Sequence, residues 1–369
     1  MNRRKNMKRI ISFILTIAAA LSLCACGNTK PEALHTAPEA PDVLYTDDCS
    51  RSVAIPAELT AIAPSGNVAT MILATIAPER LVCSGAVITD EQSRYLPAGM
   101  AELPVTGQLY GGKSTLNMES LLATGAEIVI DLGDYVPSAA EDLDALQEQI
   151  GIPCVFIEAD LPHLAEAYRK LGALLGVPER GEALASLVEE TLAMAEENAA
   201  KIDEKDRLSV LYATGPDPLG TNAAGSSQAQ VLELVGAVNA VQVDNVTSKG
   251  GGNLINMEQL YNFDPDVVLV TEDAAYEILH TDPAWQSVTA VETGACRQIP
   301  CEPYCWLSSP PSVNMVLGIW WLGNLLYPQI YDYDMAAKAQ EIYKLLWDHD
   351  LTEEECARML ERSTAKVSN

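Results

Sequence analysis

The sequence predicts an α/β protein with two similar lobes, each built on a parallel sheet, joined by one long bridging helix. Three observations support this fold class. The pattern Asn-Met-Glu-x-Leu occurs within residues 116–121 and again, 139 positions later, within residues 255–260. Short apolar segments alternate with helical ones in both halves, as in parallel sheets covered by helices. One helical stretch without proline after its start separates the halves.

The chain opens with a segment typical of an export signal. Five basic residues lie among the first nine, and residues 10–23 form a run without charge. Such a run suits a signal-peptide core and is shorter than the roughly 20 residues that a membrane span needs. Leu23, Cys24, Ala25 and Cys26 follow in a pattern similar to a lipobox, so we expect a lipoprotein signal peptide over 1–25 and a lipid on Cys26. The alternative is an ordinary secretory signal that contains two cysteines.

Residues 26–50 are predicted to form a flexible tether. The segment is rich in proline and polar residues and lacks apolar periodicity, so it cannot bury enough surface to fold alone. We expect the first lobe over 51–178, starting near Arg51. Its strands are predicted at 59–63, 81–86, 127–131 and 155–158, and a helix through Met71 and Leu73 follows the turn at 64–67.

The two repeat copies are predicted to be short helices that lead into buried strands. Asn117 and Asn256 stand at N-cap positions, each followed by a glutamate in the first turn, Glu119 and Glu258. Apolar residues at i, i+3 and i+4 are expected to face the core, and these are Met118, Leu121 and Leu122 in the first copy and Met257, Leu260 and Tyr261 in the second.

The bridging helix is expected over 179–203. Leu184, Leu187, Val188, Leu192 and Ala195 form its apolar stripe, and at about 1.5 Å per residue it reaches roughly 36 Å. The second lobe is predicted over 204–350, with strands at 208–212, 266–270 and 297–299 and a helix near 231–234. A C-terminal helix and tail are expected over 351–369.

Charge excludes one class of function. The chain has 23 basic and 51 acidic residues, a net charge of -28, and removal of the five basic residues of the signal brings it to -33. Nucleic-acid binding needs the opposite balance, so no nucleic-acid partner is expected. The four histidines are scattered, which disfavours a bare metal ion as ligand. No intrinsic cofactor is expected.

The remaining cysteines leave several possibilities open. Cys296, Cys301 and Cys305 are close in sequence but lack a CxxC pair. Free thiols, one disulfide and a metal site all fit this spacing. Residues 107–114 match the phosphate-loop pattern GxxxxGKS formally, yet the expected helix starts near Asn117 rather than at Lys113. Nucleotide binding is therefore not expected.

Signal, tether, lobe, bridging helix and second lobe together resemble the solute-binding proteins of ABC importers for iron–siderophore complexes, haem and vitamin B12. The resemblance covers residues 51–347 and rests on the paired Asn-Met-Glu-x-Leu helices and on the late segment 309–328. It implies a monomer that delivers its ligand to a permease dimer and its ATPase. It also implies that Glu119 and Glu258 contact permease arginines, which suits carboxylate–arginine pairing with a two-fold partner.

The resemblance places the ligand in the cleft between the lobes, at the carboxyl ends of the strands. Loops there offer candidate ligand contacts, which are Ser65, Asn67, Tyr110, Gly111, Tyr135, Asn222, Lys249, Tyr304 and Trp306. The tyrosines and Trp306 are suited to flat contacts with a chelate or macrocycle.

The ligand is expected to be an iron or cobalt chelate. Lys249 is the only basic residue between Arg207 and Arg297, so the second lobe has no arginine cluster for a highly anionic chelate. A hydroxamate-type siderophore, haem or a corrinoid fits better. The alternatives are a surface lipoprotein that only senses or adheres, and an exported enzyme, for which no GxSxG or HExxH motif is present.

Overall fold

The computed structural model describes residues 42–110, 114–247 and 252–364. The predicted signal peptide, Cys26, Gly111 and Lys249 lie outside these residues. The folded part starts earlier than predicted, with the antiparallel hairpin of β1 (Val43–Thr46) and β2 (Ser52–Ile55). The backbone N–H groups of Phe156 and Glu158 donate to the carboxylates of Asp47 and Asp48 at 3.2 and 2.8 Å. These bonds tie residues 43–50 to the first lobe, so the predicted tether is too long at its carboxyl end.

The first lobe contains a parallel sheet in the order β3–β4–β5, formed by β3 (Ile62–Pro64), β4 (Ile128–Gly133) and β5 (Cys154–Glu158). Successive β4 residues face opposite sides, so Ile128 and Ile130 join one buried cluster and Val129 another. The segment predicted as a strand at 81–86 makes only isolated bridges, Ile62 with Leu81 and Ser84 with Val105.

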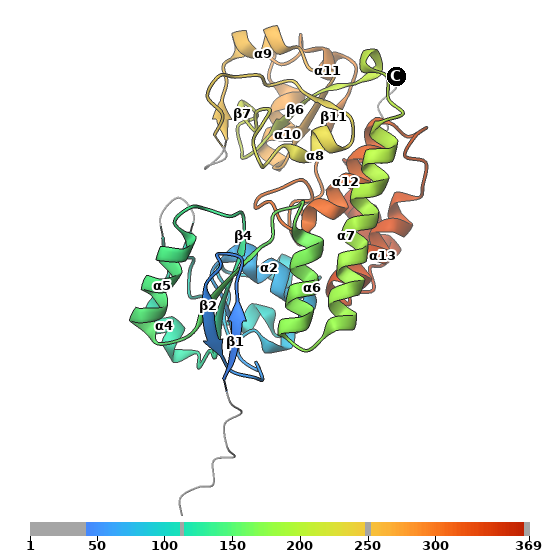
Figure 1. The fold of residues 1–369 in the computed structure, drawn as a ribbon. Helices are drawn as coiled ribbons and strands as arrows, with labels where there is room; N and C mark the ends of the chain where they lie inside the picture. Colours follow the sequence, from blue (N-terminus) through green and yellow to red (C-terminus); the bar gives the residue numbers. More distant parts are fainter. Residues whose placement is uncertain (1–41, 111–113, 248–251, 365–369) are drawn as a thin grey trace, which may run out of the picture. The chain divides into compact units, whose positions relative to one another are not determined.

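Helices cover both faces of this sheet (Figure 1). The longer ones are α2 (Asn67–Ile76), α5 (Ala139–Ile150) and α6 (Leu164–Leu174). The shorter ones are α3 (Asp90–Ser93) and α4 (Met118–Ala123), with 3-10 turns at Pro78–Arg80 and Met100–Glu102.

The second lobe has a mixed sheet in the order β11–β10–β6–β7–β9, with β8 on the side of β6. Its parallel part is β6 (Ser209–Ala213), β10 (Val267–Val270) and β11 (Cys296–Gln298), close to the predicted strands. The short strands are β7 (Gly220–Thr221), β8 (Val238–Asn239) and β9 (Asn253–Leu254), and β7 runs antiparallel to both β6 and β9. The prediction of a parallel sheet is therefore correct for its centre only.

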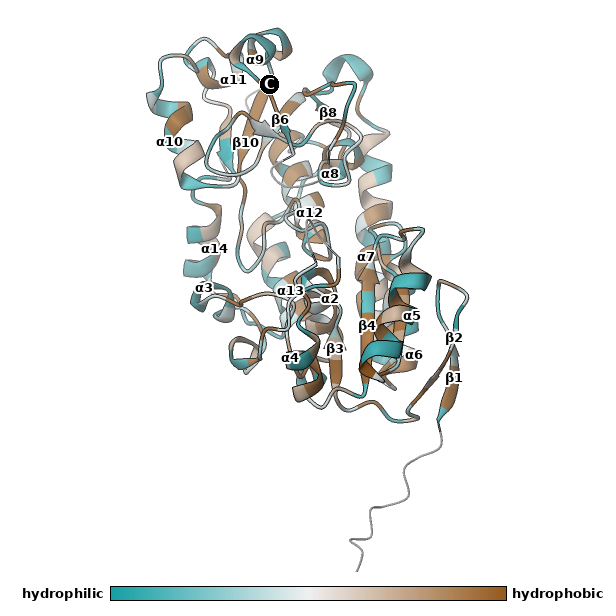
Figure 2. Ribbon diagram, turned by 90° about the vertical axis from the view of Figure 1, so that its left-hand side faces the viewer, coloured by the Kyte–Doolittle hydropathy of each residue, from teal (hydrophilic) through white to brown (hydrophobic). Residues whose placement is uncertain are grey.

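The helices of this lobe are α8 (Gln230–Leu234), α9 (Met257–Phe263), α10 (Asp273–Thr281) and α11 (Thr289–Glu292), with a 3-10 turn at Glu204–Asp206 before β6. Buried strands such as β3 and β6 are brown in the hydropathy view, as expected for central strands (Figure 2).

The predicted bridging helix is α7 (Pro178–Ala199), and Leu184, Leu187, Val188 and Ala195 of the predicted stripe are buried. It does not stand alone. Helices α12 (Asn314–Leu326) and α13 (Met335–Trp347) pack beside it (Figure 1). Twelve residues of α12 are buried, because a helix that is apolar on all sides must be covered on all sides. The Trp320 indole N–H donates to the Thr191 hydroxyl of α7 at 2.9 Å.

The predicted end of the second lobe at residue 350 is also wrong. The Arg180 guanidinium of α7 donates to the Thr75 carbonyl of α2 at 2.9 Å and to the Leu346 carbonyl of α13 at 3.2 Å. Thus α13 packs on the first lobe, and α14 (Glu353–Leu360) follows it. The lobes are joined by a junction of α7, α12 and α13. None of the helices within the described ranges is long and apolar enough to cross a membrane.

Candidate ligand-binding site

A cavity of about 330 Å³ lies at the carboxyl ends of β3 and β4. Ser65, Asn67, Tyr110, Asp131 and Phe156 of the first lobe line it, and Pro310 reaches it from the segment before α12. Carboxyl ends of parallel strands are where open α/β folds bind ligands. Three predicted contacts, Ser65, Asn67 and Tyr110, therefore meet in one cavity.

The N-terminus of α2 forms one wall of this cavity. Gly66 is its N-cap, and no side chain caps the first turn. Gly85 packs directly against the backbone of Gly66. A Cβ atom at position 85 would lie 2.2 Å from the Gly66 carbonyl carbon, so only glycine fits there. The first N–H groups of a helix have no partner inside it, so this wall can donate hydrogen bonds to an oxygen atom of a ligand.

Asp131 is the charged group at the bottom of the site. It is 4% exposed, and the Ser65 hydroxyl, also buried, donates to its carboxylate. Burial raises the pKa of Asp131 to about 6, although the hydrogen bond from Ser65 opposes the shift. Burial and the neighbouring Asp160 also raise the pKa of Asp134, which lies at the same edge.

Sequence reasoning did not select Asp131, although a signal for it exists. Asp131 ends the apolar run 128–130 of a predicted buried strand. A carboxylate at the carboxyl end of such a strand is expensive to bury and is often kept for a site.

Several predicted contacts lie elsewhere. Tyr135 is 51% exposed and does not line the cavity, although its ring centroid lies 6.1 Å from that of Phe156, which does. Asn222 is buried in the second lobe, and its side-chain nitrogen has no hydrogen-bond partner among the described residues. It does not line this cavity.

The structure corrects the expected position of Tyr304 and Trp306 in the ligand cleft. Trp306 is fully buried, and its indole N–H donates to the Glu302 carbonyl at 3.3 Å. Tyr304 is 6% exposed and packs toward Trp347. Both rings belong to the core beneath α13 because large aromatic side chains lower the free energy most when buried. Neither provides a flat surface to a ligand in this cavity.

The repeat helices confirm the predicted caps. The Asn117 side chain accepts from the Ser120 N–H at 3.0 Å, and that of Asn256 accepts from the Gln259 N–H at 2.9 Å. Glu119 and Glu258 are exposed in the first turns of α4 and α9, one on each lobe.

The predicted apolar stripes of these helices are covered in part. Leu121 and Leu260 are buried and Met257 packs, partly buried, against the core, because each short helix touches its lobe with one side. The residues exposed beside the two glutamates are Met118 at 38%, Leu122 at 48%, Leu254 at 78% and Tyr261 at 44%. The apolar residues of α4 colour part of its ribbon brown in Figure 2.

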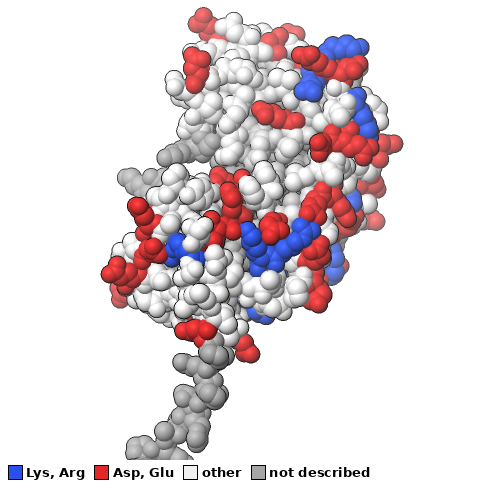
Figure 3. All heavy atoms as spheres, viewed as in Figure 1, with Lys and Arg blue, Asp and Glu red and all other residues white. Residues whose placement is uncertain are grey.

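A small group of metal-ligating residue types lies after β5. Glu158, Asp160 and His163 place their ligand atoms within 4.8 Å of one another. His163 Nδ1 lies 2.5 Å from an Asp160 carboxylate oxygen, and this hydrogen bond raises the pKa of His163. The ion pair between His163 and Asp160 explains this group without a metal ion. Acidic residues are also common elsewhere on the surface, as the face shown in Figure 3 illustrates.

Two α/β lobes on a helical junction, with a cavity at the strand ends, define the class of binding proteins that close around a solute. The chain belongs to the periplasmic binding protein family, whose model matches residues 66–302. It is 26% identical over 273 residues to the molybdate-binding protein MolA of Haemophilus influenzae, covering 67% of this chain and 74% of MolA.

Solved structures share the fold. An ABC transporter solute-binding protein from Sulfurospirillum deleyianum has a TM-score of 0.79 at 25% identity and covers 86% of this chain and 99% of its own. A periplasmic solute-binding protein from Veillonella parvula has a TM-score of 0.72 at 22% identity, with 88% and 99% covered. MolA bound to molybdate has a TM-score of 0.67 at 20% identity, with 84% and 99% covered. These similar proteins are solute-binding proteins.

Proposed function

We propose that this ABC-importer solute-binding protein captures an iron or cobalt chelate, a hydroxamate-type siderophore, haem or a corrinoid, and delivers it to a permease. The main support for this type of ligand is the set of residues that line the cavity. Its described lining residues include no lysine, arginine or histidine, and they do include Asp131 and Asp134. A strongly anionic ligand buried there would lack paired charge.

A chelate with an organic shell and little net charge matches this lining. Val68, Leu132, Val136 and Phe156 provide apolar surface. The first turn of α2 provides donors for carbonyl or hydroxamate oxygens. Ligand sites commonly combine such an apolar wall with a few placed polar groups. Ferric hydroxamates suit this combination best.

An oxyanion of the molybdate type is the second candidate. The uncapped N-terminus of α2 favours it, as does the similarity to MolA. The buried carboxyl group of Asp131 opposes it, since two negative charges would share one cavity. The two candidates therefore differ in the effect of Asp131→Asn. This change should tighten binding of an oxyanion and leave binding of a neutral chelate nearly unchanged.

The test is a ligand panel on the chain from Gly27, which keeps the whole folded unit. Ferric hydroxamates, haem, cobalamin, molybdate and free Zn²⁺ are added to wild type and to Asp131→Asn, and the unfolding midpoint is measured. A bound ligand raises the midpoint by mass action. A shift with a chelate alone supports the proposal. A shift with molybdate that grows in Asp131→Asn transfers the assignment to an oxyanion, and a shift with Zn²⁺ alone rejects both.

We also propose that Glu119 and Glu258 dock the protein onto the permease. Each carboxylate is exposed at a helix start and is flanked by exposed apolar side chains. Exposed apolar patches beside charged groups are typical of protein interfaces. Changing both glutamates to arginine should abolish uptake while ligand affinity stays unchanged. Glu141→Arg, in the exposed first turn of α5, is the matched control. Loss of ligand affinity in the double variant would contradict docking.

The lipid anchor on Cys26 is proposed from the sequence, together with an extracytoplasmic location at the membrane and a monomeric state. Cys26→Ser should release the protein from the membrane fraction and abolish incorporation of labelled fatty acid, and retention of the label in this variant would contradict the assignment. A protein that only senses or adheres should bind its ligand normally and support no uptake even as wild type. Uptake by the wild type that is lost in the double glutamate variant would instead indicate transport.

A further inference from the structure

We infer that Cys301 and Cys305 form a redox pair whose disulfide closes the turn that holds the two lobes together. The described cysteines all carry free thiols in this structure. The inference concerns which two of them can pair and what that bond would do. It does not depend on the identity of the ligand.

The backbone brings the two thiols together. The Trp306 N–H donates to the Pro300 carbonyl at 2.9 Å, which closes a turn over residues 300–306. This hydrogen bond joins the peptide unit before Cys301 to the peptide unit after Cys305, so the two cysteines flank the mouth of the same closed turn. Each thiol shifts the pKa of the other, upward for Cys301 and downward for Cys305. The turn is anchored on both sides, since Cys301 Sγ lies 3.9 Å from the Thr271 carbonyl and the Asn314 amide donates to the Cys305 carbonyl.

Cys305 is placed as the thiolate that closes the disulfide. Its sulfur lies 3.9 Å from the Tyr212 hydroxyl. The neighbouring Cys301 thiol is the largest cause that lowers the pKa of Cys305, and the backbone N–H groups of Ser308 and Leu307 lower it further, whereas burial opposes them. A thiol held as thiolate by donors is the reactive partner in disulfide exchange.

Cys301 is the partner that a reagent can reach. It is partly exposed and lines a cavity of about 340 Å³ together with Glu302, Arg358 and Arg362. Cys305 is 7% exposed. Cys296 is not a competitor, because its thiol donates to the Ala290 carbonyl at 3.7 Å, on the side of α11. If one disulfide forms among these three cysteines, Cys301 and Cys305 are therefore the pair that we expect.

The proposed reaction is an exchange with a small disulfide. Cys305 starts as a thiolate, with its own proton released to solvent. Cys301 passes its proton to this thiolate and attacks the reagent, which releases one thiolate and leaves a mixed disulfide on Cys301. That thiolate takes the proton from Cys305, and the Cys305 thiolate attacks Cys301 Sγ and expels the second thiolate, which takes up the other proton from solvent. Overall, two cysteine thiols are oxidised and one disulfide is reduced to two thiols.

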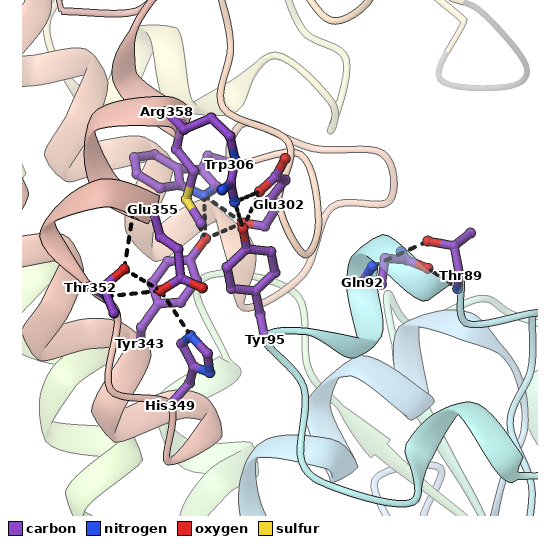
Figure 4. Close-up of polar contacts among 11 residues, drawn as sticks. Thr89, Gln92, Tyr95, Glu302, Trp306, Tyr343, His349, Thr352, Glu355 and Arg358 are labelled. Atoms are coloured by element: carbon purple, nitrogen blue, oxygen red, sulfur yellow. Dashed lines mark hydrogen bonds and ion pairs between the residues drawn. The ribbon is translucent and has the colours of Figure 1, made fainter.

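The turn between the two cysteines carries contacts between the lobes (Figure 4). The Tyr95 hydroxyl of the first lobe donates to the Glu302 carboxylate, and Gln92 Nε2 donates to the Pro303 carbonyl at 3.1 Å. Arg358 of α14 approaches the same Glu302 carboxylate at 3.4 Å. A disulfide across residues 301–305 would restrict the turn to the conformation that makes these contacts.

Peptide mapping tests the pairing. The chain from Gly27, which has seven cysteines, is equilibrated natively with mixtures of reduced and oxidised glutathione, then unfolded, alkylated and cut with trypsin. Arg297 and Lys338 bound one tryptic peptide, 298–338, that contains Cys301 and Cys305 and no other cysteine. We expect this peptide to lose both alkylation sites and the mass of two hydrogen atoms. Two alkylated thiols, a link to the peptide of Cys296, or a glutathione adduct that persists would each overturn the pairing.

Two variants and amide exchange test the consequence for the lobes. Cys305→Ser should abolish the mass change, whereas the control Cys296→Ser should keep it. In the oxidised wild type, the amides of Tyr95 and Leu96 should exchange several-fold more slowly than in the reduced protein, because opening of that contact becomes rarer. Tyr95→Phe should reduce this difference. Equal exchange in both redox states would overturn the role in holding the lobes, even if the disulfide forms.

Discussion

At the scale of single residues, Asp131 has an environment unusual for a carboxylate. Its carboxyl group is buried beneath the ligand cavity and accepts from Ser65, but no cationic side chain lines the cavity among the described residues. Desolvation therefore prevails over the hydrogen bonds from the Ser65 hydroxyl and the Leu132 backbone N–H and raises the pKa of the carboxyl group to about 6. The charge state of the site thus changes in mildly acidic solution.

This shift predicts how stability depends on pH. Between about pH 4 and 6 the folded protein holds a proton on Asp131 that the unfolded chain has released, so the free energy of unfolding falls as pH rises. A shift of about two pKa units corresponds to about 3 kcal/mol. Asp131→Asn should remove this component. Urea unfolding of both proteins from pH 4 to 7 measures it, and a constant difference between them across that range would contradict the assigned pKa.

At the scale of elements, α4 and α9 show how a repeated motif serves a surface rather than the core. Their caps form as predicted, and each helix leads into a buried central strand, β4 or β10. Each buries one leucine and leaves neighbouring apolar residues in solvent. This pattern explains why helical periodicity overestimated their burial, because periodicity reports the spacing of apolar residues and not what covers them.

Two adjacent leucines of α4 give a matched test. Leu121 is fully buried and Leu122 is 48% exposed. Leu121→Ala should lower the free energy of unfolding by about 2–5 kcal/mol, because it leaves a cavity. Leu122→Ala should change it by less than about 0.5 kcal/mol and should reduce uptake if α4 docks to the permease. Urea unfolding and uptake are measured on both variants, and a large stability loss in Leu122→Ala would show that its side chain is covered.

At the scale of the whole folded unit, the connection between the lobes is a packed junction. Helix α7 is accompanied by α12 and α13, and Arg180 links α7 to carbonyls of both α2 and α13. The C-terminal helices thus return to the first lobe. Such a junction should limit the bending that a single helix would permit, so closure of the cleft is expected to be small.

Removal of the Arg180 guanidinium tests the junction. Arg180→Met keeps the aliphatic part and leaves the Thr75 and Leu346 carbonyls without this donor. We expect a loss of about 2–3 kcal/mol in the free energy of unfolding, the usual range for buried hydrogen bonds to a charged group. Arg169→Met is the control, since Arg169 forms exposed ion pairs with Glu182 and Glu189 and should matter much less. Equal effects in the two variants would refute the special role of Arg180.

The sequence by itself determined the features that depend on local chemistry. Apolar runs located β3, β4, β5, β6 and β10, the asparagine caps located α4 and α9, and the stripe of α7 located the bridging helix. The family resemblance named Ser65, Asn67 and Tyr110 among nine expected ligand contacts, and the structure brings these three together in one cavity at the carboxyl ends of parallel strands.

Only the tertiary structure decided which side chains are buried and which elements pack against one another. Trp306, expected in the cleft, is buried in the core, and Leu122, expected to be covered, is exposed. Asp47 and Asp48 accept hydrogen bonds from β5, and α13 packs against the first lobe. The tertiary structure also placed Asp131 beneath the cavity. These outcomes depend on contacts between residues far apart in the chain, and neither periodicity nor propensity contains that information.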